Sequence, residues 1–464
     1  QTFSFQADSA TLSIDWGDSQ TTTESTPTTG LRSHSYSTAG TYNISLNGVA
    51  TRIAFGGTGT TATLLKDILT KMSDGLTGIT SAYQMFRGCT NITTFTEPAF
   101  FDDVSGNVIN LEVMFRDATN FNGNVSGWDT SKANTMNQVF YGATVFNQSV
   151  NTWNTSNVTK MDYTFANARA FNQDLSNWDT SKVTSMTATF AGCTKFNQDI
   201  SNWNVSSVKS FFQAFSSTAS FNQPLNSWDT SSVTTMAFMF YGAKAFNQPL
   251  NSWNTSKVTN MGSMFQGATS FNQSLNSWDT SEVITMAYMF FGATNFNGDI
   301  SSWDTSSVTT MENMFNGAKN FNGNISTWNT SSVKYLGGAF SGASSFNQPL
   351  NNWNTSKVTD MNSMFWGASN FNQDLDNWDT SKVTTMQYMF RNAISFNQPL
   401  NSWNTSEVTS MATMFNGATA FNKPLNSWNT SKVTTMSEMF RSATSFNQDL
   451  NNWNTSKVTS MANM

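Results

Sequence analysis

Pairs of aspartates are the residues of this chain whose type and spacing could perform chemistry. Asp174 and Asp179 lie five residues apart, as do Asp374 and Asp379, and two neighbouring carboxylates could act as general acid and base in a hydrolysis. Equivalent pairs recur at several places along the chain, whereas a catalytic constellation is normally singular. We therefore interpret these aspartates as structural and expect no enzyme activity, with a carbohydrate-active enzyme as a minor alternative.

Other residues with metal-binding or nucleophilic side chains are scarce. The chain has a single histidine, His34, and two cysteines, Cys89 and Cys193. These are too few for a zinc site or a histidine-dependent triad, so we expect no catalytic residue, no cofactor and no metal. Asp15 and Asp18 could bind a cation, but turn formation is the more common role of aspartate in such a stretch.

The low content of charged residues and the lack of long apolar runs limit which partners this chain is expected to have. Charged residues make up 11% of the chain and the net charge is −6, against about 25% charged residues in ordinary soluble domains. Phosphate binding needs clustered Lys and Arg, so we expect no nucleic acid partner. No apolar run approaches the roughly 20 residues of a membrane helix, and we expect no membrane span in this segment.

The aspartate pairs belong to a 25-residue repeat. Its clearest copy, residues 171–195, reads FNQDLSNWDTSKVTSMTATFAGCTK, and its Phe-Asn start recurs from residue 121 to residue 446, which gives 14 regular turns, the last of them incomplete. A fixed period of 20 to 50 residues is typical of solenoids, in which each repeat needs its neighbours to bury its apolar face. Since the last copy breaks off at Met464, we expect either a continuing chain or contact with another molecule there.

Positions within a repeat are numbered here as offsets from the starting phenylalanine. The apolar offsets are 0, 4, 7, 12, 15, 18, 19 and 22, and the helical spacing of the last five predicts a short helix over offsets 12 to 20. Offset 21 is Gly in most copies, and Asn in Asn167 and Asn392, which predicts a left-handed residue after that helix. Asp or Asn at offset 8 with Ser at offset 10 predicts an Asx-turn that caps the helix.

The segment FNQDLSNW, offsets 0 to 7, predicts one short parallel strand per repeat. Proline cannot donate to a ladder, so we expect an interruption at offset 3, where Pro224, Pro249, Pro349, Pro399 and Pro424 stand.

Ten positions of the clearest copy are predicted to be structural: Phe171, Asn172, Leu175, Trp178, Asp179, Ser181, Val183, Met186, Phe190 and Gly192. The tryptophans at offset 7 are predicted to be core residues, although an exposed column could bind sugars. The asparagines at offset 1 are predicted to satisfy backbone groups between repeats, with ligand binding as the alternative. Cys89 and Cys193 fall in one column four repeats apart, too far for a disulfide, and are predicted to be buried free thiols.

The chain before the repeats divides into two parts. Residues 1–50 show alternating apolar residues in TFSFQ, TLSIDW and TYNISLNG, which predicts a small antiparallel β-sandwich. Residues 51–94 are interpreted as a junction and N-terminal cap, with a helix predicted over residues 64–72. The solenoid is predicted over residues 95–464, with one irregular turn before residue 121.

Two stretches resemble known families. IDWGDS (residues 14–19) and HSYSTAGTYNISL (residues 34–46) resemble the PKD-type, immunoglobulin-like domain of extracellular proteins. MFYGAKAFNQPLNSWNTSKVTNM (residues 239–261) resembles the BspA-like leucine-rich-repeat surface proteins of bacteria, and the resemblance covers residues 95–464. It implies a leucine-rich-repeat fold, an extracellular location and an adhesin-type role.

The sequence thus predicts an extracellular structural or adhesive surface protein, a rigid repeat rod or arc that displays a binding surface. Its expected partner is a protein or glycan of a host, matrix or neighbouring cell, or another copy of the chain. The main alternative is a self-assembling surface filament or virion fibre. A further alternative is ice binding by the threonines at offset 9, which only Val205 interrupts. Asn154, Asn204 and Asn454 fit glycosylation sequons, although the Asx-turn already explains them.

Overall fold

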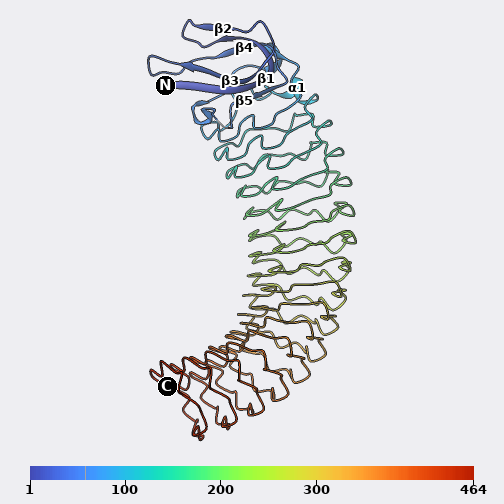
Figure 1. The fold of residues 1–464 in the computed structure, drawn as a ribbon. Helices are drawn as coiled ribbons and strands as arrows, with labels where there is room; N and C mark the ends of the chain where they lie inside the picture. Colours follow the sequence, from blue (N-terminus) through green and yellow to red (C-terminus); the bar gives the residue numbers. More distant parts are fainter. Residues whose placement is uncertain (58) are drawn as a thin grey trace. The chain divides into compact units, whose positions relative to one another are not determined.

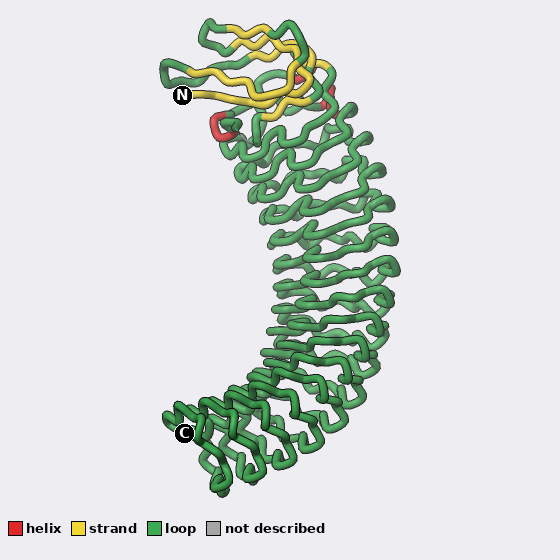
Figure 2. Tube along the Cα trace, viewed as in Figure 1, coloured by secondary structure: helices red, strands yellow, loops and turns green. Residues whose placement is uncertain are grey.

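The computed structural model describes residues 1–57 and 59–464 of the chain. Contacts divide them into two compact units, Gln1–Pro224 and Leu225–Met464, and each unit is described by itself. All named strands of the described residues lie in the first unit, where they precede the 25-residue repeats (Figures 1 and 2). The second unit consists of repeats alone.

Six strands form the sheet at the start of the first unit: β1 (Thr2–Asp15), β2 (Thr21–Thr23), β3 (Thr28–Ser35), β4 (Ser45–Val49), β5 (Arg52–Ala54) and β6 (Leu76–Thr77). The long strand β1 pairs antiparallel with β2, β3, β4 and β5, and β4 pairs in parallel with β6. The first half of β1 pairs with β3 and β5, and its second half with β2 and β4. Antiparallel strands are therefore present in residues 1–50, as the alternation predicts.

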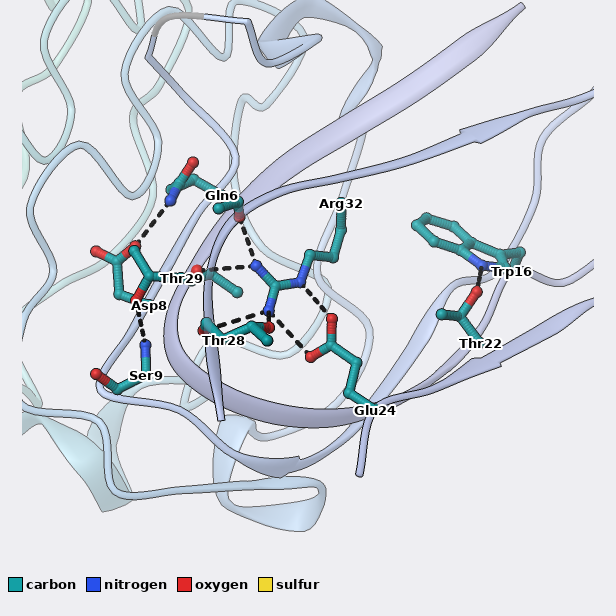
Figure 3. Close-up of polar contacts among 11 residues, drawn as sticks. Gln6, Asp8, Ser9, Trp16, Thr22, Glu24, Thr28, Thr29 and Arg32 are labelled. Atoms are coloured by element: carbon teal, nitrogen blue, oxygen red, sulfur yellow. Dashed lines mark hydrogen bonds and ion pairs between the residues drawn. The ribbon is translucent and has the colours of Figure 1, made fainter. Parts of the chain in front are cut away.

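The two halves of β1 are separated by a bulge. Its register with β3 shifts between Ala7 and Ala10, and Ser9 has a φ of 44°. Arg32, only 7% exposed, spans this point: its guanidinium forms an ion pair with Glu24 at 2.7 Å and donates to the carbonyl oxygen of Ala7 at 3.0 Å (Figure 3). A buried charge must be paired and hydrogen-bonded to be tolerated, so this arginine fixes the bend in β1.

The helix predicted over residues 64–72 is wrong. Only the short 3-10 turns η1 (Ala62–Leu64) and η2 (Met72–Asp74) lie there, and η1 has no side-chain cap. A helix of this length is marginal in water without packing, and several apolar side chains of this segment stay half-exposed. The only α-helix in the described part of the chain is α1 (Asp102–Ser105), so none of its helices is long enough to cross a membrane.

Neighbouring repeats pair through isolated parallel bridges at offset 14, as in Lys160 to Ser185 in the first unit and Thr285 to Thr310 in the second. The column begins on β5, where Arg52 pairs with Ser81. The strand predicted at offsets 0 to 7 is therefore misplaced, because that segment forms no ladder of its own.

The helix predicted at offsets 12 to 20 is also wrong. In the clearest copy the chain forms overlapping β-turns, in which the N–H of Thr189 bonds to the carbonyl of Met186 and that of Ala191 to the carbonyl of Ala188. Left-handed residues at offset 17, such as Ala188 (φ 52°), and at offset 21, such as Gly192 (φ 72°), interrupt any helix. The left-handed conformation predicted at offset 21 is confirmed.

The core consists of columns of aromatic rings. Phe171, Trp178 and Phe190 are 0%, 4% and 1% exposed, and phenylalanines at offset 19 lie ring to ring, as Phe165 does 5.7 Å from Phe190. Leu175, Val183 and Met186 complete the same core. Each repeat thus buries its apolar side chains against the next one, as expected when single repeats are too small for a core.

Candidate binding surface

One wall of each repeat is joined to the next repeat by main-chain hydrogen bonds. The N–H groups at offsets 15, 17, 19 and 21 donate to carbonyls 24 residues further on: Met161 to Ser185, Tyr163 to Thr187, Phe165 to Thr189 and Asn167 to Ala191, at 2.6 to 3.2 Å. The same pattern already joins residues 82–88 to residues 110–116. This ladder wall requires no particular side chain.

The opposite wall is joined by asparagine side chains. Asn172 Oδ1 accepts the main-chain N–H of Asn197 at 2.9 Å, and the N–H of Asn172 is bound in the same way by Asn147. The side-chain nitrogen of Gln173 donates to the same oxygen of Asn147 at 3.1 Å. This asparagine wall therefore depends on one residue type, which accounts for Asn at offset 1 in every repeat.

Between the walls, Trp178 and Asp179 tie the chain together. The indole nitrogen of Trp178 donates to the carbonyl of Val150 in the preceding repeat at 2.9 Å. The carboxylate of Asp179 accepts the N–H of Ser181 at 2.9 Å in the predicted Asx-turn. Hydrogen bonds from the hydroxyl and N–H of Ser181 lower the pKa of this carboxyl. No helix follows, so the motif closes a turn and does not act as a helix cap.

Offsets 16, 17 and 20 lie on the ladder wall and are called the variable face. Offset 17 holds nine residue types among 14 repeats and offset 20 holds eight among 13, whereas Phe at offset 0 and Trp at offset 7 never change. Most of the larger side chains at offsets 17 and 20 are half-buried or exposed. This contrast is visible when the repeats are aligned with one another, but the predictions from the sequence did not use it.

The backbone conformation at offset 17 is unfavourable for most of the side chains found there. Phe238, Tyr288 and Thr413 stand there with φ of 58°, 59° and 62°, a region that bulky and β-branched residues rarely adopt. Offset 21 has the same left-handed backbone but is filled mainly by glycine, as in Gly292. Strained residues of this kind cluster at functional sites, so we take the variable face as the candidate binding surface.

Aromatic and arginine side chains gather on this face. In the second unit the rings of Trp366 and Tyr388 stack with centroids 5.9 Å apart, and the Arg391 guanidinium lies 5.0 Å from the first ring and 5.8 Å from the second. Trp366 is 39% exposed, and the Nε of Arg391 has no hydrogen-bond partner within the described part of the chain. In the first unit, Arg116 lies 4.8 Å from the ring of Tyr141.

A family model described as "Mycoplasma protein of unknown function, DUF285" matches residues 80–190, 172–276, 247–326, 298–380 and 367–464. The chain belongs to the DUF285 family. No curated protein matches it. The matches begin where the main-chain ladder begins, and they show a repeat protein without naming an activity.

Within the DUF285 repeats, the paired aspartates are engaged in turns. Asp174 accepts the N–H of Ser176 at 2.9 Å, and Asp374 and Asp379 accept N–H groups two residues on in the same way. In the described residues no three His, Cys, Asp or Glu side chains gather as metal ligands. The carboxylates thus already serve as turn acceptors.

Before the DUF285 repeats, Asp15 and Asp18 also close turns. Asp15 accepts the N–H of Gly17 at 2.9 Å. Asp18 accepts the N–H of Gln20 at 3.2 Å, and its other oxygen lies 2.8 Å from Nε2 of His34. The turn role predicted for these two aspartates is confirmed.

The two cysteines are free and buried, as predicted. Burial raises the pKa of the Cys89 thiol to about 12 and also raises the pKa of the Cys193 thiol, so neither forms a reactive thiolate at neutral pH.

The threonines at offset 9 are buried from Thr130 to Thr430, and Thr455 in the last copy is exposed. Thr180 is 1% exposed, and its hydroxyl donates to the carbonyl of Asn204 at 2.8 Å. The same bond recurs from Thr130 to Thr430. From Thr130 to Thr430 these hydroxyls are thus bonded within the repeats.

Proposed function

We propose that this DUF285 protein is an extracellular structural or adhesive surface protein whose variable face binds a protein or glycan of a host, matrix or neighbouring cell. In this proposal the repeats form a solenoid of the leucine-rich-repeat class, related to the BspA-like surface proteins. The strands before them form a PKD-like domain. The carrying observation is the varied, bulky set of side chains at offset 17 on a backbone that favours glycine.

Two features support binding rather than catalysis. The recurring carboxylates accept hydrogen bonds from their own turns, which leaves them as structural acceptors. The variable face offers aromatic rings and guanidinium groups, and such residues are enriched at the energetic centres of protein interfaces. A main-chain ladder beneath them lets the side chains differ from repeat to repeat without loss of the stacking bonds.

The test uses the whole purified chain, labelled with a fluorophore, and binding to intact eukaryotic cells measured by flow cytometry. The double variant Trp366→Ser with Tyr388→Ser removes one aromatic cluster. Serine already occupies these two offsets in Ser341 and Ser363, so the variant should fold. We expect at least tenfold weaker binding, as for loss of an aromatic hot spot.

The matched control replaces Lys357 and Lys382 by serine at offset 11, where Ser207 and Ser332 stand in other repeats. This control should bind like the unchanged chain. Pretreatment of the cells with protease or with glycosidases separates a protein partner from a glycan partner. Analytical ultracentrifugation of the same samples reports self-association. Equal binding by both double variants, or hydrolysis of a surface polymer, would contradict the proposal.

A further inference from the structure

A cavity of about 830 Å³ lies in the first unit, between the strands and the segment 63–72 that leads into the repeats. Its size falls within the range of roughly 300 to 1,000 Å³ that is usual for small-molecule sites. The residues that line it are distinct from those of the variable face, so a ligand could bind there whether or not the protein is an adhesin.

One wall of the cavity is rigid and apolar. Phe3 and Phe5 of β1, Ile53 of β5, Phe55 and Phe100 line it, and each is at most 8% exposed. Their positions are fixed by strand pairing and by ring contacts, such as the one that joins Phe5 and Phe55 at 6.0 Å. Phe3 and Phe55, at 7% and 8%, keep the exposed surface of this wall, and Phe5, Ile53 and Phe100 support them from beneath.

The other wall consists of aliphatic side chains that remain partly exposed. Leu64, Leu65 and Ile68 are half-buried, and Leu69 is 50% exposed. All four line the cavity, and the segment that carries them is largely irregular between η1 and η2. Apolar side chains gain free energy when they leave water, so an apolar occupant would complete a core that this segment leaves open.

The lining also contains aromatic and polar residues. It includes the stacked rings of Tyr36 and Tyr42, with centroids 4.0 Å apart, Leu76 of β6 and Asp74 of η2. The aliphatic side chains of the segment 64–69 are the part of the lining that a hydrocarbon chain would cover.

A lysine at the rim offers a counter-charge. Lys66 lines the cavity, and its ammonium donates to the hydroxyl of Thr41 at 3.3 Å. Among the residues that the structure describes, it pairs with no carboxylate. Lys71 differs, because it lies 3.5 Å from a carboxylate oxygen of Asp103.

The two aspartates that line the cavity leave this counter-charge in place. Asp67 accepts hydrogen bonds from the N–H and hydroxyl of Thr96, and Asp74 is exposed, where solvent screens its charge.

We propose that this cavity binds the acyl chain of a long-chain carboxylate, with the alkyl chain between β1 and the segment 63–72 and the carboxylate beside Lys66. The ligand class follows from the apolar residues of β1, β5 and the segment 64–69 that line the cavity and from the ammonium of Lys66, which pairs with no carboxylate among the described residues. Binding would order the segment 63–72 against the strands.

Isothermal titration calorimetry with the full chain tests the site, using hexanoate, octanoate, decanoate and dodecanoate below their micelle concentrations. Affinity should rise about fourfold per added methylene, since each is transferred from water to an apolar wall. Dodecan-1-ol should bind several-fold more weakly than dodecanoate, and Lys66→Met should abolish that difference. Hydrogen exchange of residues 63–72 should slow on binding.

Leu65→Trp fills the cavity and should weaken dodecanoate binding at least tenfold. Ile284→Trp, an equivalent change at a 51% exposed residue of the second unit, should leave binding unchanged. Absence of heat with every carboxylate, affinity independent of chain length, or unchanged binding by Leu65→Trp would overturn the site. Equal binding of the alcohol and the carboxylate by the unchanged chain would overturn the role of Lys66.

Discussion

The two walls of a repeat are joined to the next repeat by hydrogen bonds from different atoms. The ladder wall joins repeats through main-chain N–H and C=O groups, such as Tyr163 to Thr187. The asparagine wall joins them through side-chain oxygens, such as Asn147 to Asn172. Every residue except proline supplies an N–H and a C=O, but few side chains can replace asparagine. The first wall is therefore free to vary in sequence and the second is not.

This difference explains where function can be placed on such a chain. Side chains at offsets 16, 17 and 20 can change from Gly338 to Tyr388 while the ladder bonds persist. A change at offset 1 breaks the bonds that hold the repeats together. Variation and stability are thus assigned to opposite walls.

The largest expected effect comes from the tryptophan that lies between the walls. Trp278→Ala should lower the free energy of unfolding by about 3 to 5 kcal/mol, as for other buried aromatic truncations, because Trp278 is 3% exposed and donates to the carbonyl of Leu250 at 2.9 Å. Hydrogen exchange should show greater opening in the adjacent repeats than in distant ones. Trp278→Phe, which keeps most of the ring contact, should cost less. Uniform opening along the unit would argue against nearest-neighbour coupling.

Asn372 tests the asparagine wall directly. Asn372→Ala should cost about 1 to 3 kcal/mol, because its Oδ1 accepts both the N–H of Asn397 at 2.9 Å and the side chain of Gln398 at 3.0 Å. Asn372→Asp keeps an acceptor and should cost less. Gln266→Ala on the variable face should change stability by less than about 0.5 kcal/mol. Chemical denaturation measures all three, and an equal cost at both walls would remove the distinction.

The left-handed residues at offsets 17 and 21 predict stability changes of opposite sign. Thr413→Gly at offset 17 should raise stability by about 1 kcal/mol, because a β-branched residue is strained at φ 62°. Gly417→Ala at offset 21 should lower it by about 1 to 2 kcal/mol, since the added Cβ would lie 2.2 Å from Oδ1 of Asn392. Thermal melting compares the pair. The same sign at both positions would refute the account of strain given for the variable face.

The smallest effect concerns the aspartates at offset 8. Hydrogen bonds from serine lower the pKa values of Asp179, Asp229, Asp304 and Asp379. Because each folded-state pKa lies below the unfolded value, the stabilisation is complete above the unfolded pKa and is lost as the pH falls through the folded pKa. Replacing all four by Asn should flatten the decline in melting temperature between neutral pH and about pH 3. An unchanged pH profile would show that these hydrogen bonds do not contribute to the pH dependence of stability.

The repeat and its period could be predicted from the sequence, but the secondary structure within it could not. Val183, Met186, Phe190 and Cys193 have helical spacing, and overlapping β-turns also bring every third or fourth residue inward. The helix and the overlapping turns differ only in backbone angles. The residues at offset 17, such as Gln138 and Tyr163, have a positive φ, but glutamine and tyrosine do not predict one. Glycine at offset 21 did indicate a positive φ, so the conformation of that position was predicted correctly.

The candidate sites were hidden for different reasons. The variable face is a property of the comparison between repeats, and it was available in the sequence. The cavity depends on how the segment 63–72 lies against β1, and its apolar spacing predicted a helix that would have packed those leucines. Arg32 could not be placed over the bulge of β1 either, because Ala7, whose carbonyl it binds there, lies 25 residues earlier in the chain.

The tryptophan column of the second unit has an optical consequence. From Trp253 to Trp453 the indole rings lie 6.0 to 6.5 Å apart and within 8° of parallel. At such separations an excited indole passes its energy to the next ring before it emits, so light absorbed at one repeat emerges from another. Because neighbouring rings are nearly parallel, each transfer turns the emitting dipole little and the emission should stay polarised. One quencher placed at any repeat should reduce the emission of several neighbouring repeats. A repeat that opens interrupts this energy migration. The number of tryptophans that one quencher affects therefore reports how many consecutive repeats remain folded.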